Sequence, residues 1–222
     1  GAKIKWVDIE ESTLTIDPKE IEKNITSNTK VILPVHLFGV PANMLEIKKI
    51  AKKYNLKIIE DACLATGAKI GSKKIGSIGD LTVFSFNPGK ILDGIGPGGI
   101  ITTNSKKFYN KLIQLRDYGK DNNSRIKDSF SKIIGFNSKL SNVNATILNL
   151  RLKKIRAYIK KREENVKLYK QYLNLDVNNF QSYYQESQPV WRNFTIKIDN
   201  RNLVYNFLKK KGINTFKGYY PP

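Results

Sequence analysis

The sequence predicts an α/β fold with a mainly parallel sheet and flanking helices. Two short apolar runs, 31–35 and 57–60, have the length and composition of buried strands. Between them, residues 44–55 carry apolar side chains at the i, i+3, i+4 and i+7 spacing of a helix face. A strand, a helix and a strand within about thirty residues form a βαβ unit, whose two strands run parallel.

The elements that follow extend this unit. The glycine-punctuated segment 71–80 predicts a small hairpin, and the apolar runs 81–86 and 99–103 predict strands. A helix is expected over 105–119, where Gly119 ends it. The polar stretch 120–132 predicts a mobile loop.

A long helix, with room for one break, is expected from Ser141 to about Tyr172. Beyond Asn174 the pattern changes to a strand candidate over 190–198 and a helix over 203–212. We therefore place a domain boundary inside the long helix. The expected domains are 1–155, a large domain, and 156–222, the start of a small α+β domain.

Composition limits the class of protein. The chain has 222 residues, 40% of them hydrophobic and 26% charged, as in ordinary soluble globular proteins. No apolar run has the length that a membrane span needs. Cys63 is the single cysteine, which excludes a disulfide framework and favours a reducing cytoplasm. We interpret Cys63 as a packed residue rather than a nucleophile.

The formal net charge of +20 has two interpretations. Lysine on solvated faces explains it without any partner, whereas a polyanion partner is the functional alternative. Residues 151–162 carry seven basic side chains and no acid, but an apolar stripe at helical spacing makes these the outer face of an amphipathic helix. No zinc-ligand spacing or RNA-binding aromatic motif supports nucleic-acid binding.

The most informative stretch is 81–99, LTVFSFNPGKILDGIGPGG. Lys90 lies in a Pro-Gly turn five residues after Ser85, which ends a predicted strand. Asp61 directly follows the strand 57–60, at the carboxyl end where ligands of open α/β sheets bind. Pyridoxal-phosphate chemistry needs an amine for the cofactor aldehyde and a carboxylate for its pyridine nitrogen. A solvated lysine and a capping aspartate are the structural alternatives.

Other candidates are weaker. Ser85, with Asn87, could bind a cofactor phosphate through hydroxyl and amide donors. His36, the single histidine, follows an apolar strand and could either line the pocket and contact substrate or be a packed core residue. One histidine without clustered partners cannot build a metal site, so none is expected. Asn137 could simply cap a turn.

Several motifs occur in order along the chain. They are KWVDIEESTLTIDPKEIEKNITSNTKVILPVHLFGVPANM, IIEDA, GSIGDLTVFSFNPGK, GGIITTN, LRDYG, GFNSKLSNVNATIL and GINTFKGYYPP. Together they resemble the DegT/DnrJ/EryC1/StrS sugar-nucleotide aminotransferases, which have the fold-type-I scaffold of enzymes dependent on pyridoxal 5'-phosphate.

The resemblance assigns roles by position. It implies that Asp61 binds the pyridine nitrogen, that Lys90 binds the aldehyde and moves the proton, and that Ser85 contacts the phosphate. Asn137 would reach the phosphate from the neighbouring subunit, so a homodimer with shared active sites is implied. The implied reaction transfers the amino group of glutamate to a keto-sugar nucleotide, for deoxyamino sugars of polysaccharides or natural products.

The chain also departs from the family pattern. Leu64 stands where the family has a glutamine that touches the phenolic oxygen of the cofactor, and leucine makes no hydrogen bond there. Thr66, Pro97 and Lys139 are further departures. The chain starts at Gly1 within strand-like sequence and ends directly after GINTFKGYYPP. We therefore expect both domains to be incomplete, the large one lacking an N-terminal phosphate loop.

Two other functions remain open. Relatives that dehydrate the sugar share this scaffold but carry histidine in place of the lysine, so Lys90 favours amino transfer. The other alternative is a truncated, non-catalytic paralogue that binds polyanions through its basic surface.

Overall fold

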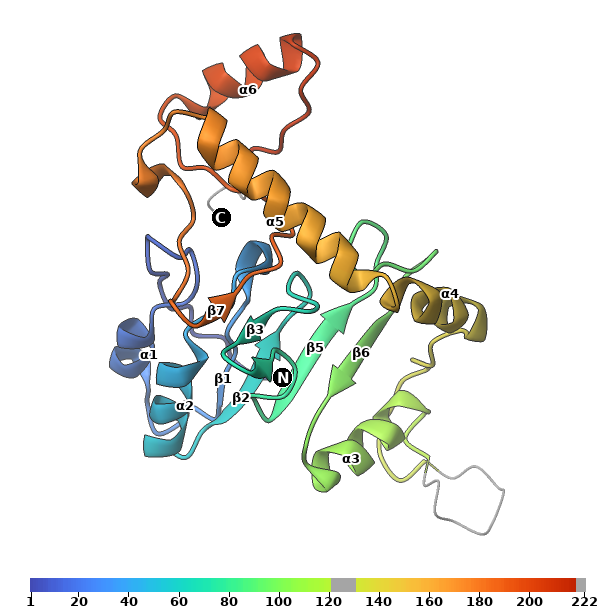
Figure 1. Ribbon diagram of the computed structural model, residues 1–222. Helices are drawn as coiled ribbons and strands as arrows, with labels where there is room; N and C mark the ends of the chain where they lie inside the picture. The colour runs from blue at the N-terminus through green and yellow to red at the C-terminus, as the bar shows by residue number, and fades with distance from the viewer. Residues whose placement is uncertain (121–130, 219–222) are drawn as a thin grey trace.

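A four-stranded sheet forms the centre of the molecule (Figure 1). The structure is a computed structural model and describes residues 1–120 and 131–218. The strands lie in the order β1-β2-β5-β6, with the first three parallel and β6 antiparallel to β5. Their bounds are β1 (Val31–Ile32), β2 (Lys57–Asp61), β5 (Leu81–Ser85) and β6 (Gly99–Thr102). The predicted mainly parallel α/β fold is confirmed, and the predicted strands 81–86 and 99–103 are antiparallel neighbours.

A smaller antiparallel sheet has the order β4-β3-β7. The predicted hairpin is present but lies earlier in the chain than the expected 71–80: β3 (Lys69–Ile70) pairs with β4 (Lys73–Lys74) on either side of a turn at Gly71. The third strand, β7, comes from the C-terminal part of the chain and pairs antiparallel with β3. The bounds are β3 (Lys69–Ile70), β4 (Lys73–Lys74) and β7 (Ser187–Gln188).

Six α-helices lie in the described residues. Figure 1 shows α1 and α2 beside β1 and β2, whereas α3 and α4 lie beyond β6. The bounds are α1 (Pro18–Asn24), α2 (Met44–Lys53), α3 (Lys106–Arg116), α4 (Asn142–Leu152), α5 (Ile155–Tyr172) and α6 (Arg201–Lys210), with short 3-10 turns at Leu37–Gly39 and Val177–Asn179. None of these helices has the length and apolar character that crossing a bilayer requires.

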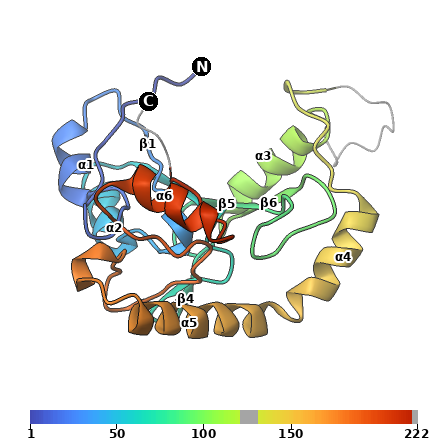
Figure 2. The ribbon, with the colours of Figure 1, turned by 90° about the horizontal axis from the view of Figure 1, so that it is seen from above.

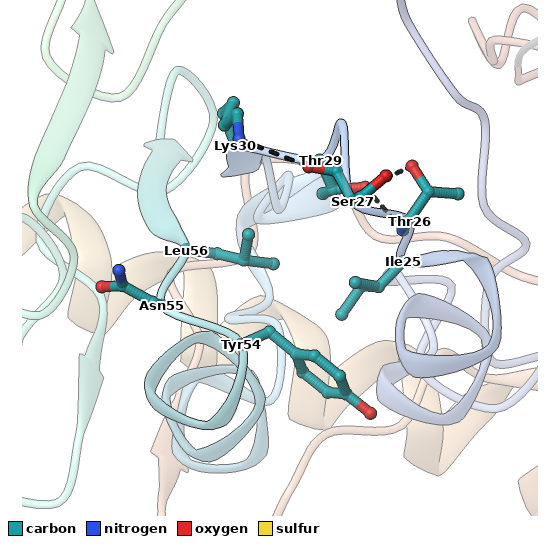
Figure 3. A pocket seen from close by; sticks show the side chains of 8 residues that line it. All are labelled: Ile25, Thr26, Ser27, Thr29, Lys30, Tyr54, Asn55 and Leu56. Carbon is teal, nitrogen blue, oxygen red and sulfur yellow. Dashed lines mark hydrogen bonds between the residues drawn. The ribbon is translucent and has the colours of Figure 1, made fainter.

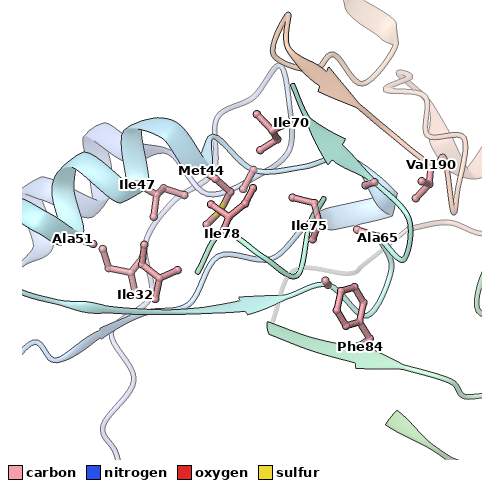
Figure 4. Close-up of a cluster of buried hydrophobic side chains, with 14 of the residues drawn as sticks. Ile32, Met44, Ile47, Ala51, Ala65, Ile70, Ile75, Ile78, Phe84 and Val190 are labelled. Atoms are coloured by element: carbon pink, nitrogen blue, oxygen red, sulfur yellow. The ribbon is translucent and has the colours of Figure 1, made fainter. Parts of the chain in front are cut away.

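Helix α2 shows how the sequence builds the core. The side chain of Asn43 caps its first turn by accepting a hydrogen bond from the Glu46 amide at 3.2 Å. Its buried face, which includes Met44 and Ile47, packs against the sheet. Figure 4 shows these side chains meeting Ile32 of β1 and residues of the 65–78 connection. The apolar periodicity that predicted this helix is the face that the core buries.

The predicted long helix is two helices. α4 ends at Leu152 and α5 begins at Ile155, with Lys153 and Lys154 between them. The expected apolar stripe is correspondingly split, because Leu152 is 49% exposed while Ile155 and Ile159 pack against the core. Figure 2 shows α5 extending from α4 toward the C-terminal segments. The proposed boundary at residue 155 coincides with the start of α5 and stays a prediction.

Two strand expectations were wrong. Residues 190–198 form no strand, and the strand-like N-terminal run contributes one isolated bridge, Ile9 to Ile16. Around Trp191 the backbone amides bond to the loop after β1 instead, Val190 to the carbonyl of Gly39 and Asn193 to that of Phe38. The helix expected at 203–212 is confirmed as α6. Most of the expected 120–132 loop lies outside the described residues.

Candidate active site

Asp61 and Ser85 end two adjacent strands on the same face of the sheet. Asp61 is the last residue of β2 and pairs in register with Val83 of the parallel strand β5, which Ser85 ends. Side chains alternate along a strand, so Asp61, Val83 and Ser85 share a face. The burial pattern agrees, because these three are half-buried whereas Thr82 is buried on the opposite face. The carboxylate and the hydroxyl therefore lie at the same edge of the sheet.

Lys90 lies in the turn that follows β5. Its amide donates to the carbonyl of Asn87 at 3.1 Å, which closes the turn. Gly89 has φ +86, a conformation that favours glycine, and its amide donates to Asp93 Oδ2 at 3.1 Å. Asp93 is held in turn by Arg151 of α4, whose Nη1 donates to the Asp93 carbonyl at 2.8 Å and to its carboxylate. The lysine is half-buried on a turn that α4 holds through Arg151.

The glycine-rich tail of this turn is held by Asn144, which sequence reasoning missed. The side chain is 4% exposed, and Oδ1 accepts the Ile95 amide at 3.1 Å. Nδ2 lies 3.5 Å from the Gly96 carbonyl and 3.3 Å from that of Pro97. Gly94 leaves the room for it, because a Cβ there would lie 2.0 Å from Asn144 Oδ1. The sequence did contain a signal for Asn144: it is a polar residue one helical turn before Leu148, and so lies on the helix face that the apolar spacing predicts to be buried.

Cys63 lies two residues after Asp61, at the end of β2. Asp61 Oδ1 accepts the Cys63 amide at 3.0 Å, which fixes the carboxylate at the strand end. Burial, followed by hydrogen bonding and the negative charge of Asp61, raises the pKa of Cys63 to about 11. The positive charge of Lys90 acts in the opposite direction and lowers this pKa. The high pKa agrees with the prediction that Cys63 is a packed residue.

His36 has its ring fully buried. Nδ1 accepts the Ala42 amide at 3.0 Å, so Nε2 carries the hydrogen and faces Glu60 Oε2 at 3.0 Å. Glu60 Oε1 accepts from Gly79 at 2.6 Å and from the Thr82 hydroxyl at 2.8 Å. With both nitrogens occupied, this ring offers a substrate no free polar group. The geometry supports the packed-histidine alternative over the pocket-lining one.

Two further sequence candidates lie in different places. Leu64 is half-buried three residues after Asp61, and its carbonyl lies beside Gly39. Asn137 is exposed and bridges Asp117 in the segment between α3 and α4. Among the interactions of the described residues, none joins Asn137 to Asp61, Ser85 or Lys90. The structure thus places Asp61 and Ser85 at one edge of the sheet, with Lys90 in the turn that follows β5, and leaves Asn137 on the surface of this chain.

Similarity to known proteins decides the family. The sequence profile of the DegT/DnrJ/EryC1/StrS aminotransferase family matches residues 1–222. The chain belongs to this family. It is 36% identical over 222 residues to the dTDP-3-amino-3,6-dideoxy-alpha-D-galactopyranose transaminase of Aneurinibacillus thermoaerophilus, covering 100% of this chain and 60% of that protein. It is 34% identical over 224 residues to a pleiotropic regulatory protein of Geobacillus stearothermophilus, covering 100% of this chain and 59% of that protein.

A solved structure agrees. S. venezuelae DesV in complex with a ketimine intermediate superimposes with a TM-score of 0.86 at 34% identity, over 94% of this chain and 55% of that one. The solved structures similar to this chain are fold-type-I aminotransferases, which confirms the predicted scaffold. The DegT-family chain spans less than two thirds of the length of these relatives.

Two pockets of the DegT-family chain lie at the opposite edge of the sheet. One is lined by Ile25, Tyr54 and Leu56 among others (Figure 3). Lys30 and Leu56, which also line it, directly precede β1 and β2, so this pocket is at the amino ends of the strands. The second pocket includes Asp80, which directly precedes β5. Neither pocket is lined by Asp61, Ser85 or Lys90.

The residues at the carboxyl edge fit pyridoxal phosphate. A half-buried carboxylate, a hydroxyl and an amine from a tight turn are the donor set that a phosphorylated pyridine aldehyde requires. The fit is incomplete at Leu64, whose side chain has no hydrogen-bonding atom. The described residues contain no group of three histidine, cysteine or acidic side chains that could hold a metal ion.

Proposed function

We propose that the protein containing this chain is a pyridoxal-phosphate-dependent aminotransferase that moves the amino group of glutamate to a keto-sugar nucleotide. The observation that carries the proposal is the shared edge: Asp61 and Ser85 end neighbouring strands on one face, and Lys90 follows in the next turn. Family membership and the names of the relatives support the same activity.

Each residue has a role that its position supports. Asp61 would hold a proton on the pyridine nitrogen, and Ser85 would donate to the cofactor phosphate. Lys90 would bind the aldehyde carbon and, once released, carry the proton between the substrate carbon and the cofactor. When bound, pyridoxal phosphate supplies the electron sink that stabilises negative charge on the substrate carbon. Leu64 would give an apolar contact where relatives have a polar one.

The finer assignments follow from family resemblance. We propose a cytoplasmic homodimer in which Asn137 serves the site of the partner subunit, because Asn137 is exposed and, among the described residues, forms a β-bridge with Asp117 and no hydrogen bond or ion pair with Lys90. The product would be a deoxyamino-sugar nucleotide used for polysaccharide or natural-product synthesis. Lys90 supports amino transfer over dehydration, since dehydrating relatives carry histidine there.

The test is direct. Purified protein is incubated with pyridoxal phosphate, reduced with borohydride and digested, and the cofactor mass should appear on the peptide containing Lys90. Lys90→Ala should remove that mass and abolish glutamate-dependent amino-sugar formation, whereas Lys19→Ala, an exposed lysine on α1, should change neither. Labelling of another lysine in the unaltered protein would contradict the assignment. A dehydrated product without amine transfer would favour the dehydratase.

A further inference from the structure

The short turn Leu37–Gly39 lies between the C-terminal part of the chain and the edge of the sheet that carries Asp61. It follows His36, whose amide donates to the Asp61 carbonyl at 3.0 Å. The turn also closely approaches Leu64, because a Cβ on Gly39 would lie 3.1 Å from the Leu64 carbonyl oxygen. This 37–39 turn and the residue before it therefore contact the end of β2 and the residues that follow it.

The C-terminal part of the chain binds every carbonyl of the 37–39 turn. The three hydrogen bonds run from Gln181 Nε2 to Leu37 at 3.3 Å, from the Asn193 amide to Phe38 at 3.2 Å and from the Val190 amide to Gly39 at 3.0 Å. Phe38 has φ 59, a left-handed conformation that costs energy in a bulky residue and persists where surrounding contacts impose it. The shape of the turn is thus imposed by a distant part of the chain.

Arg162 of α5 binds the same segment, 190–193, through its carbonyls. Arg162 Nη1 donates to the carbonyl of Trp191 at 3.1 Å and to that of Arg192 at 3.2 Å. Burial, and then the charge of Arg192, lowers the pKa of Arg162. Hydrogen bonds from a charged donor are stronger than those between neutral groups, so this half-buried guanidinium fixes the backbone that it binds. The segment is therefore bonded to the 37–39 turn through its amides and to α5 through its carbonyls.

We propose that Arg162 is a positioning residue for the cofactor site, which fixes the Asp61 carboxylate through the segment 190–193 and the 37–39 turn. Every step beyond the guanidinium is a main-chain hydrogen bond or a close main-chain contact. Loss of the guanidinium therefore frees two carbonyls and lets the segment shift against the turn. Arg162 acts through these segments and is not a catalytic residue. The inference rests on the proposed function, because it assigns Arg162 to the binding of pyridoxal phosphate.

The first test needs no cofactor. Hydrogen exchange of the cofactor-free protein is measured by mass spectrometry in the peptides that contain residues 36–39 and 61–64. Arg162→Gln should accelerate exchange in both peptides, because their amides lose protection when the segment 190–193 shifts. Arg162→Lys should have a smaller effect, because it keeps the charge but not the fork. Arg156→Gln, an exposed arginine on α5 with the same charge change, should exchange as the unaltered protein does. Unchanged exchange in Arg162→Gln would overturn the proposal.

The second test measures the effect on the cofactor. In Arg162→Gln the affinity for pyridoxal phosphate, measured by spectroscopic titration, should fall about twofold to thirtyfold, the usual effect of residues that act on a site from outside it. The pH midpoint of the cofactor absorption should move down, because a displaced Asp61 carboxylate stabilises the protonated pyridine nitrogen less. Unchanged affinity and an unchanged midpoint would overturn the positioning role.

A stability control separates positioning from general destabilisation. Ile21→Ala leaves a cavity under α1, so it should lower the midpoint of urea unfolding but leave the affinity, the pH midpoint and the exchange of the two peptides unchanged. Equal cofactor effects in Ile21→Ala and Arg162→Gln would overturn the proposal. Failure of the unaltered protein to bind pyridoxal phosphate would instead contradict the proposed function, and hydrogen exchange would still decide whether Arg162 fixes the end of β2.

Discussion

His36 Nε2 lies 3.0 Å from Glu60 Oε2, and both side chains are fully buried. Glu60 belongs to β2 and directly precedes Asp61, whose carboxylate is predicted to bind the cofactor. The His36–Glu60 pair therefore supports this end of the strand. Both partners are otherwise saturated, His36 by the Ala42 amide and Glu60 by Gly79 and Thr82. The single histidine of the chain is thereby explained as a structural residue.

His36→Ala should destabilise the protein strongly. It would leave the Glu60 carboxylate and the Ala42 amide buried with one partner fewer, and breaking a buried pair in this way costs about 3–5 kcal/mol. Urea denaturation of the purified variant measures the loss. A change below about 1 kcal/mol would show that the ring contributes little to folding.

The stability of the protein should depend on pH through Glu60. Burial acts to raise the pKa of Glu60, but the hydrogen bond and charge of His36, with the donors Gly79 and Thr82, outweigh it and leave the pKa below its usual 4.5. A carboxyl whose pKa is lower when folded stabilises the protein above its unfolded pKa. This contribution is lost as the pH falls below 4.5 and through the folded pKa.

The measurement is the free energy of unfolding from pH 7 to pH 3 for the unaltered protein and for Glu60→Gln. The unaltered protein should lose stability more steeply below pH 4.5, since the variant has no carboxyl to protonate at this position. Parallel curves would show that Glu60 titrates normally.

Asn144→Ala should loosen the turn that presents Lys90. The amide side chain is buried and holds the backbone of residues 95–97, so its removal leaves buried polar groups unpaired, at a cost of about 1–3 kcal/mol. Thermal unfolding measures the loss, and the affinity for pyridoxal phosphate should fall with it. Asn142→Ala, at the exposed start of the same helix, is the control. Equal effects of the two substitutions would contradict the role given to Asn144.

The sequence was sufficient to predict the elements whose apolar residues form a face that is buried in the core. β2 and β5 were predicted from short apolar runs and α2 from apolar residues at helical spacing, and Asp61 and Lys90 were found from their positions next to such elements. The resemblance to a family then added roles that spacing alone could not give.

Tertiary contacts decided the elements that were wrong. The run around Trp191 has strand-like composition, but its amides donate to carbonyls of residues 38 and 39. No local sequence pattern predicts this pairing. Asn144 was missed for the same reason, because it holds the tail of the Lys90 turn from 49 residues away in the sequence. Residues that converge from distant segments leave no periodic signal in one sequence.

Leu64→Gln should strengthen cofactor binding. Leu64 stands three residues after Asp61 and has no hydrogen-bonding atom, whereas an amide there could donate to an oxygen on the pyridine ring. One such bond is worth about 1 kcal/mol, or roughly a fivefold gain in affinity for pyridoxal phosphate, with a shifted absorption maximum. Spectroscopic titration measures both, and Leu64→Met is the control of similar size. Weaker binding by Leu64→Gln would show that this position needs an apolar side chain.

The reactivity of Cys63 tests whether Asp61 and Lys90 face each other across it. A thiol with a pKa of about 11 has little thiolate at pH 8, so a disulfide reagent should modify the folded, cofactor-free protein roughly tenfold more slowly than the urea-denatured protein. Asp61→Asn should accelerate the reaction, because it removes the neighbouring negative charge. Lys90→Gln should slow it further, because it removes the positive charge that favours the thiolate. Opposite responses to these two substitutions require both side chains to lie near Cys63, and identical rates in the two variants would contradict the shared edge on which the proposed active site depends.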